Sequence, residues 1–287
     1  MIKVIILAEN YVKDPICKGE WGLALYIETD EMTLLFDTGA SPMMVENARA
    51  KGVDLSKVDA CIISHGHFDH TGGLLAFFQK NDKAPVYMHK DAFGITYGEM
   101  NGQIDNYNCG ILWNKKELEP YKDRLYFTDG PVRLSGNIVV SGTIPDIPNF
   151  KPVETFYRVL NPKMTGDKCV TKQQLIPDTM SHEQFLGILD IDKGITLFSG
   201  CSHKGIIAAV EYGKNLFPEH PLYAVIAGMH LIGADNTMRG KVINKLMNEN
   251  PSYVVPLHCT GLDAVCMMKA VFGKKCLLTG TGGQFKL

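Results

Sequence analysis

The sequence has no apolar run near the roughly 18 residues of a membrane span, no cluster of lysine and arginine, and no cysteine pair spaced C-x-x-C. We therefore expect no membrane partner. The missing basic cluster and a net charge of -2 argue against nucleic acid as a binding partner, since nucleic-acid binders usually carry a basic stripe. The eight cysteines are scattered over 287 residues, unlike the short, cysteine-dense chains that disulfides hold together.

The amino-terminal segment MIKVIILAEN has a short apolar run followed directly by polar residues. It lacks the small-residue cleavage site of a signal peptide, so we interpret it as a first strand. Together with the scattered cysteines, it predicts a cytoplasmic protein with reduced thiols, most of them small buried side chains.

Hydrophobic residues make up 45% of the chain and charged residues 21%, as in ordinary globular proteins. Short apolar runs alternate with helical patterns, which predicts the α/β (α+β) class and a single domain over residues 1–287. The expected strands are 23–29, 33–36, 59–64, 85–89, 137–141, 185–190, 195–198, 222–227, 253–257 and 275–278. The expected helices are 43–51, 71–80, 205–216, 241–248 and 262–272.

Residues from about 91 to 130 do not show this alternation of strand and helix patterns. They contain several aromatic side chains between Gly, Asn and Lys. We interpret this segment as an insertion, serving as a lid, a substrate loop or an oligomer contact. A plain surface excursion with its own small cluster is an equal alternative.

The strongest chemical signal is the run SHGHFDHTGG at residues 64–73. His65, His67, Asp69 and His70 lie within six residues, directly after an apolar strand. His65 and His67 can point to one side of an extended segment, and the other two follow as the chain turns into a helix. Imidazole nitrogen and carboxylate oxygen are ligands that zinc favours. The pattern predicts a metal site, because chance clustering of these residue types after a buried strand is improbable.

Three more histidines follow apolar strands. They are His203 after ITLFSG, His230 after LYAVIAG and His258 after YVVPL. Ligands in α/β proteins collect at the carboxyl ends of strands, so each is a candidate site residue.

The H-x-H-x-D-H run resembles the signature of the metallo-β-lactamase superfamily, and the order of the remaining elements agrees over nearly the whole chain. The resemblance implies a four-layer αββα sandwich with metals in a shallow cleft at the sheet edges. Asp37, in FDTG, is similar to the family's early strand-end aspartate, which supports the metal loop. The resemblance implies that the first metal is held by His65, His67 and His182, and the second by Asp69, His70 and His258.

The chain departs from the family pattern where most members have a metal-bridging aspartate. Cys201 stands there, with His203 two residues on. A Cys201 thiolate would suit zinc as a ligand. In the alternative that we favour, His203 is the ligand and Cys201 packs beneath it. The context of His182 also differs from the usual Pro-Gly-His-Thr.

The combination of HEQ, GCSHKG, GMHL and HCTG resembles a subgroup labelled as dihydropterin-linked ribofuranosylaminobenzene phosphate synthases or metal-dependent hydrolases. We expect an enzyme that uses a metal-bridging hydroxide to hydrolyse a small ester, lactone or phosphoester. Asp69 would accept a proton. His230 would protonate the leaving group or hold a phosphate, and a structural histidine that supports the site or the core is an equal alternative. The expected cofactors are two divalent ions, with zinc first and iron or manganese as alternatives.

Two other functions remain open. One is a transferase of the synthase type in pterin metabolism, and the other is a metal-binding regulator without catalysis. The intact cluster argues against the regulator, since Asp69 adds little to a structural zinc site. The expected partner is a small molecule, and assembly into a homo-oligomer is left open.

Overall fold

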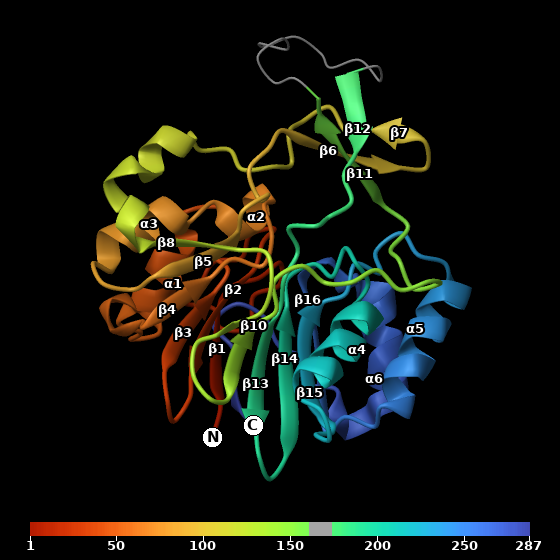
Figure 1. Ribbon diagram of the computed structural model, residues 1–287. Coiled ribbons are helices and arrows are strands. Elements are labelled where there is room, and N and C mark those ends of the chain that lie inside the picture. The colour runs from red at the N-terminus through yellow and green to blue at the C-terminus, as the bar shows by residue number, and fades with distance from the viewer. Residues whose placement is uncertain (161–173) are drawn as a thin grey trace.

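The computed structural model describes residues 1–160 and 174–287. Two large β-sheets form its centre (Figure 1). The first sheet has seven strands in the order β17-β1-β2-β3-β4-β5-β8. Their bounds are Lys3–Ala8 (β1), Ala24–Glu28 (β2), Thr33–Phe36 (β3), Ala60–Ile62 (β4), Val86–His89 (β5), Leu125–Thr128 (β8) and Gln284–Lys286 (β17). Strands β3, β4, β5 and β8 run parallel, so their carboxyl ends meet at one edge.

The second sheet has six strands in the order β16-β15-β14-β13-β10-β9. Their bounds are Val132–Arg133 (β9), Ile138–Val140 (β10), Leu186–Asp190 (β13), Gly194–Ser199 (β14), Leu222–Gly228 (β15) and Tyr253–Leu257 (β16). Strands β14, β15 and β16 are parallel, and their carboxyl ends also share one edge.

Apolar side chains from both sheets meet in the space between them. Because side chains alternate along a strand, Leu25 and Ile27 of β2 face the second sheet, whereas Tyr26 faces the opposite side. The rings of Phe36 and Phe198, from β3 and β14, lie 6.4 Å apart at their centroids. This apolar layer fixes the two sheets against each other, and with them the two strand edges that carry the candidate ligands.

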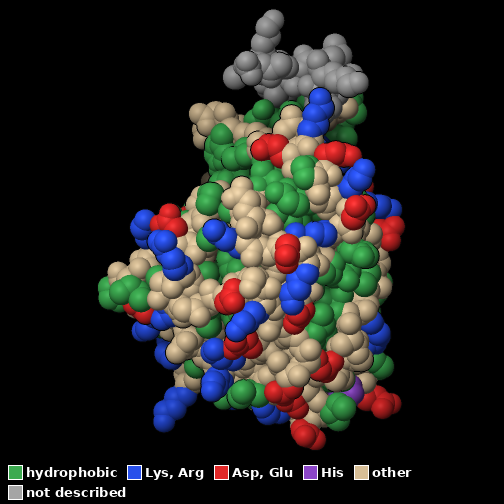
Figure 2. All heavy atoms as spheres, turned by 90° about the vertical axis from the view of Figure 1, so that its left-hand side faces the viewer, with side chains coloured by type: hydrophobic (Ala, Val, Ile, Leu, Met, Phe, Trp, Pro, Cys, Tyr) green, Lys and Arg blue, Asp and Glu red, His purple; other side chains and the backbone are tan. Residues whose placement is uncertain are grey.

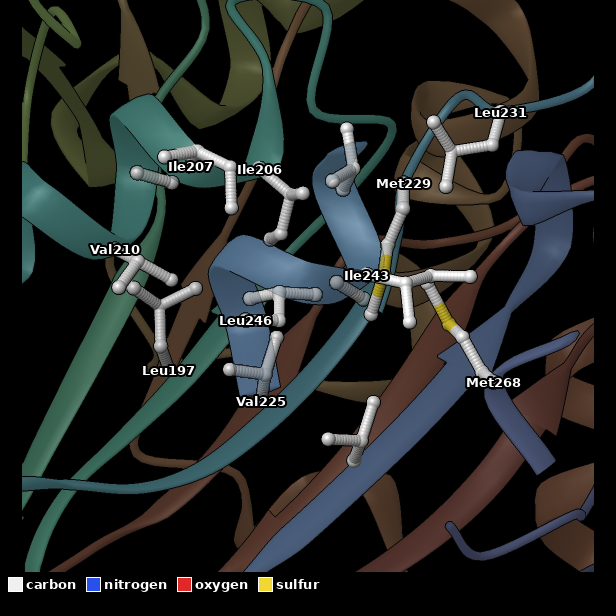
Figure 3. Packing of buried hydrophobic residues seen from close by; sticks show 14 of the residues in the cluster. Leu197, Ile206, Ile207, Val210, Val225, Met229, Leu231, Ile243, Leu246 and Met268 are labelled. Carbon is white, nitrogen blue, oxygen red and sulfur yellow. The ribbon is translucent and has the colours of Figure 1, made fainter. Parts of the chain in front are cut away.

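Helices cover the outer face of each sheet. Those on the first sheet are α1 (Met43–Ala50) and α3 (Leu74–Lys80), and those on the second are α4 (Ile206–Leu216), α5 (Asn236–Asn248) and α6 (Leu262–Phe272). Figure 3 shows Ile207 and Val210 of α4 with Ile243 and Leu246 of α5 in the apolar cluster over the second sheet. The predicted four-layer αββα fold is confirmed. No helix in the described part of the chain has the length and apolar character needed to cross a bilayer.

A third, four-stranded sheet stands above the two large ones in Figure 1. It has the order β12-β11-β6-β7, with bounds Thr96–Met100 (β6), Gln103–Ile104 (β7), Thr155–Val159 (β11) and Leu175–Pro177 (β12). The predicted insertion at about 91–130 therefore supplies only half of this sheet. It continues through a 3-10 helix, Lys115–Arg124 (η2), and its last part forms β8 of the first large sheet.

Two local predictions from the sequence are wrong. The strand expected at 275–278 is reduced to one bridge between Cys276 and Val254, because the chain leaves α6 through a short 3-10 turn. The last strand is β17 instead. The helix expected at 241–248 begins earlier, because the side chain of Asp235 caps it by accepting a hydrogen bond from the backbone N–H of Met238.

Candidate metal centre

The histidine-rich loop lies between β4 and a single helical turn, α2 (Phe68–Thr71). His65, His67, Asp69 and His70 are all at least nine-tenths buried, and the rings of His65 and His67 lie 4.6 Å apart at their centroids. Gly66 between them has no space for a side chain, since a Cβ atom would lie 1.9 Å from the carbonyl oxygen of Ala92. The glycine lets the loop press against the neighbouring segment and keeps both imidazoles turned inward.

Asp37, directly after β3, holds this loop in place through hydrogen bonds. Its Oδ1 accepts a hydrogen bond from the backbone N–H of Ser64, and its Oδ2 accepts one from the Ser64 hydroxyl, both at 2.7 Å. The same Oδ2 lies 2.7 Å from Nδ1 of His70. Since the Ser64 proton goes to Asp37, Ser64 Oγ accepts from Nδ1 of His65 at 2.8 Å. Both imidazoles therefore keep Nδ1 protonated and direct Nε2 away from Asp37.

One set of candidate ligands combines Asp69, His70, Cys201 and His258, whose ligand atoms all lie within 4.8 Å of one another. Nε2 of His70 is 3.1 Å from the Cys201 sulfur, and Nε2 of His258 is 3.1 Å from Oδ2 of Asp69. Asn10 orients His258, because its Oδ1 lies 2.9 Å from the other ring nitrogen. A thiolate, two imidazoles and a carboxylate form a donor set that a tetrahedral zinc-like ion accepts.

Imidazole rings form a second set of candidate ligands: those of His65, His67 and His203 lie 4.6–4.8 Å apart at their centroids. The Nε2 atoms of His65 and His203 lie 3.2 Å apart, and the rings of His67 and His203 lie 4.7 Å apart at their centroids. Two imidazoles bound to one zinc at about 2.1 Å each would have their nitrogens about 3.4 Å apart, so the observed spacing fits shared ligation. Nε2 of His67 is buried without a hydrogen-bond partner among the described residues, as expected of a ligand atom.

The two sets adjoin each other through Asp69 and Cys201. Ligand atoms of His65, Cys201 and His203 lie within 4.8 Å of one another, as do those of His65, His67 and Asp69. Each of these two residues therefore has ligands of both sets as neighbours. This places Cys201 and His203 together in the centre, although the sequence presented them as alternatives.

The pKa values follow from burial and from neighbouring charges. Burial, together with the other imidazoles, lowers the pKa of His67 to about 3 and lowers those of His65 and His203 as well. Burial has the same effect on His70, but the carboxylates of Asp69 and Asp37 outweigh it and raise its pKa to about 9. The three imidazoles of the second set are thus neutral at pH 7, with lone pairs available to a cation.

His182, which the resemblance assigned to the first metal, is in none of the described groups of ligand atoms that lie within 4.8 Å of one another. Its Nδ1 accepts a hydrogen bond from the backbone N–H of Gly66 at 3.1 Å. Its Nε2 lies 3.4 Å from Oδ2 of Asp178, which is also paired with Arg158 at 2.6 Å. Its ring centroid is 6.3 Å from that of His65. Its Nε2, like that of His67, is buried without a hydrogen-bond partner among the described residues, so its assignment as a ligand stays a prediction.

His230 follows β15 and faces partners that the sequence did not predict. Its Nε2 is 2.5 Å from Oε2 of Glu154. Cys201 and Cys259 lie on its other side, and the ligand atoms of these two cysteines and His230 are within 4.8 Å of one another. Burial lowers the pKa of His230, but Cys259 and Glu154 more than offset this and raise it to about 10. The sequence signal for Cys259 was its place beside His258, whereas Glu154 has no local motif.

Most of the candidate ligands line one cleft of about 120 Å³: His67, Asp69, Cys201, His203, His230, His258 and Cys259. Aromatic side chains and two carboxylates form its walls: Trp21, Phe68, Asp105, Tyr107, Glu154 and Phe156. Most of the wall belongs to the small sheet and its loops, including part of the predicted insertion. A wider depression of about 640 Å³ beside α1 has neither histidine nor cysteine among its lining residues.

Comparisons with known proteins identify the family of this chain. The family model of the metallo-beta-lactamase superfamily matches residues 22–149. A 7,8-dihydropterin-6-methyl-4-(beta-D-ribofuranosyl)-aminobenzene-5'-phosphate synthase of Methanocaldococcus jannaschii is 30% identical, and the match covers 94% of this chain and 92% of that protein. An uncharacterized protein of the same organism is also 30% identical, over 92% of each chain.

The fold has a close counterpart among solved structures. Tm1679, described as a metal-dependent hydrolase of the beta-lactamase superfamily, superposes with a TM-score of 0.79 over 100% of this chain and 99% of its own, at 23% identity. The four layers, the histidine-rich loop at the strand ends and the long match to the M. jannaschii synthase lead to one assignment: the chain belongs to the metallo-beta-lactamase superfamily.

Proposed function

We propose that this protein is a metal-dependent hydrolase that acts on a small ester, lactone or phosphoester with two divalent cations. The observation that carries the proposal is the meeting of two buried ligand sets at Asp69 and Cys201 on the floor of one cleft. His65, His67 and His203 would hold one cation, and Asp69, His70, Cys201 and His258 the other. Bound there, zinc-like cations would lower the pKa of water towards neutrality and polarise a substrate oxygen.

The chain's own groups prepare this chemistry. Asp69 is the one carboxylate among the proposed ligands, so we assign it to orient the attacking water and accept its proton. Asp37 and Ser64 hold His65 and His70 with their Nε2 atoms turned to the cations. Asn10 does the same for His258. These buried hydrogen bonds fix the ligand geometry before any substrate arrives.

The side chains that line the cleft limit which substrates it can bind. Trp21, Phe68, Tyr107 and Phe156 offer aromatic surface, and the described residues that line the cleft include no lysine or arginine. An anionic group such as a phosphate would therefore have to be bound by the cations. A flat, uncharged part of the substrate would pack on the aromatic wall.

A synthase is the second candidate, favoured by the name of the M. jannaschii relative. Such an enzyme would form a bond on a phosphorylated pterin-type substrate where a hydrolase breaks one. The same cations could serve it by polarising the substrate. The two functions differ in whether water is the nucleophile, which a hydrolysis assay reports directly.

The setting that we propose is cytoplasmic, with a small-molecule substrate and no nucleic acid. The cysteines in the described part of the chain are all free thiols. On the face shown in Figure 2, Lys and Arg side chains are interspersed with Asp and Glu, without a broad basic patch. Phosphate backbones bind to such patches, so this face offers them little.

The test is metal analysis of the purified protein together with assays on a chromogenic phosphodiester and a chromogenic lactone. We expect at least two cations per chain, turnover of at least one substrate, and loss of turnover in Asp69→Ala. Asp82→Ala, which removes an exposed carboxylate, is the matched control and should behave as wild type. A single tightly held cation with no turnover of either substrate would rule out the two-metal hydrolase and favour the synthase or a non-catalytic regulator.

A further inference from the structure

Cys201, His230 and Cys259 form a third group of converging ligands beside the two described above. Their ligand atoms lie within 4.8 Å of one another, and all three side chains are at least nine-tenths buried. His230 and Cys259 belong to neither of the other sets. We infer that these three residues bind a further thiophilic cation of the zinc type, with Cys201 shared between this position and the proposed two-metal centre.

The first argument concerns the two nitrogens of His230. Nε2 lies 2.5 Å from Oε2 of Glu154, so that nitrogen donates its proton to a carboxylate. Nδ1 is buried and has no hydrogen-bond partner among the described residues. A metal-binding histidine usually has a carboxylate on one ring nitrogen and leaves the other nitrogen to the metal. Buried polar atoms are rarely left unpaired, and a cation between Nδ1 and the two sulfurs would satisfy this one.

The second argument concerns the space made for the Cys259 sulfur. A Cβ atom on Gly228 would lie 2.9 Å from that sulfur, so a side chain at position 228 would displace it. Gly228 ends β15, and Cys259 follows the end of the neighbouring strand β16. The sheet edge therefore has room for a second thiol next to Cys201. All three ligand residues line the cleft, which gives a cation a path from solvent.

The third argument is chemical. Two sulfurs and one imidazole form a softer donor set than the histidine and carboxylate ligands of His65, His67 and Asp69, and soft ligands select zinc or similar ions over magnesium or calcium. A thiolate can serve two neighbouring cations, so Cys201 need not leave the other set. The sequence predicted that His230 protonates a leaving group or holds a phosphate. With Nε2 held by Glu154 and Nδ1 directed at two thiols, the geometry favours a ligand.

The experiment is a cobalt(II) titration of the metal-free protein, followed by equilibrium dialysis and by the near-ultraviolet absorption that cobalt–thiolate bonds produce. We expect wild type to bind one more equivalent than Cys259→Ser or His230→Gln. The thiolate absorption of Cys259→Ser should fall to about one third, since one of three cobalt–sulfur bonds remains. Cys266→Ser, which removes an exposed thiol outside all three sets, is the control and should match wild type.

The outcomes separate this assignment from the proposed function. If wild type, Cys259→Ser and His230→Gln bind the same number of equivalents with the same thiolate absorption, the third position does not exist, and His230 and Cys259 form only an ion pair. In His65→Ala, the two-metal centre should lose cobalt while the equivalent that depends on Cys259 stays. If instead all of the bound cobalt depends on Cys259, the proposed two-metal centre fails and the third position stands alone.

Discussion

Nδ1 of His70 lies 2.7 Å from Oδ2 of Asp37, and both side chains are completely buried. The same carboxylate accepts two hydrogen bonds from Ser64, and the Ser64 hydroxyl oxygen accepts one from His65. One aspartate at the end of β3 therefore orients a histidine in each of the two ligand sets. This connection couples the two cation positions through protein groups beneath them.

Replacing Asp37 with Asn should weaken both positions. Asn keeps the volume of the side chain but carries an amide N–H₂ in place of one acceptor oxygen, so it cannot serve Ser64 and His70 as before. We expect cation affinity to fall about 10- to 100-fold, measured by competition with a chromophoric chelator. Asp82→Asn is the control at an exposed position. An affinity equal to wild type in Asp37→Asn would contradict the orienting role.

His203 and His182 can be separated by a pair of substitutions. His203→Ala should lose one equivalent of bound metal, because it removes a nitrogen 3.2 Å from Nε2 of His65. His182→Ala should keep both equivalents and lose thermal stability, because His182 accepts a hydrogen bond from Gly66 inside the protein. Metal analysis and thermal unfolding of both variants give the answer. Loss of metal in His182→Ala alone would restore the ligand set that the family resemblance implied.

The metal-free protein should lose stability in acid because of His67. Its folded-state pKa of about 3 lies below the ordinary value of 6.5, so the unfolded chain binds the proton more readily between these values. The stability is complete above pH 6.5 and declines as the pH falls towards 3. At pH 5 the loss from this residue is about 2 kcal/mol.

Urea unfolding of metal-free wild type and His67→Gln at pH 5 and pH 7 measures this loss of stability. Gln does not titrate, so the variant should show a pH dependence smaller by about 2 kcal/mol. Subtracting the two proteins cancels the contributions of other groups, including His70, whose raised pKa acts in the opposite sense. Equal pH dependence in both proteins would show that His67 is protonated as easily when folded as when unfolded.

Local patterns in the sequence predicted the parts of the molecule that depend on local structure. Buried strands such as β4 show as apolar runs, and the ligands at their ends show as His and Asp directly after them. The family resemblance added the order of the layers. Both kinds of signal located the loop at residues 64–73 and the ends of β14, β15 and β16.

The place of His203 beside His65 depends on contacts that no motif encodes. Glu183 accepts hydrogen bonds from the backbone N–H groups of His203 and Lys204, both at 2.6 Å, and so turns the His203 segment towards the loop. Glu154 reaches His230 from a segment 76 residues away in sequence. Such pairings follow from the tertiary packing of distant segments, which periodicity and spacing do not report.

Gly66→Ala should damage the centre through the backbone alone. The added methyl would lie 1.9 Å from the carbonyl oxygen of Ala92 and 2.7 Å from its carbon, and neither backbone atom can move as a side-chain end could. The loop would have to shift, separating His65 from His67, so we expect about 2–4 kcal/mol of lost stability and a clear loss of bound metal. Gly240→Ala is the matched control, because a methyl there meets no atom within 4 Å in helix α5 and should stabilise the protein by about 1 kcal/mol. If Gly66→Ala kept both its unfolding midpoint and its metal content, the close approach of the loop to Ala92 would have no part in holding the two histidines.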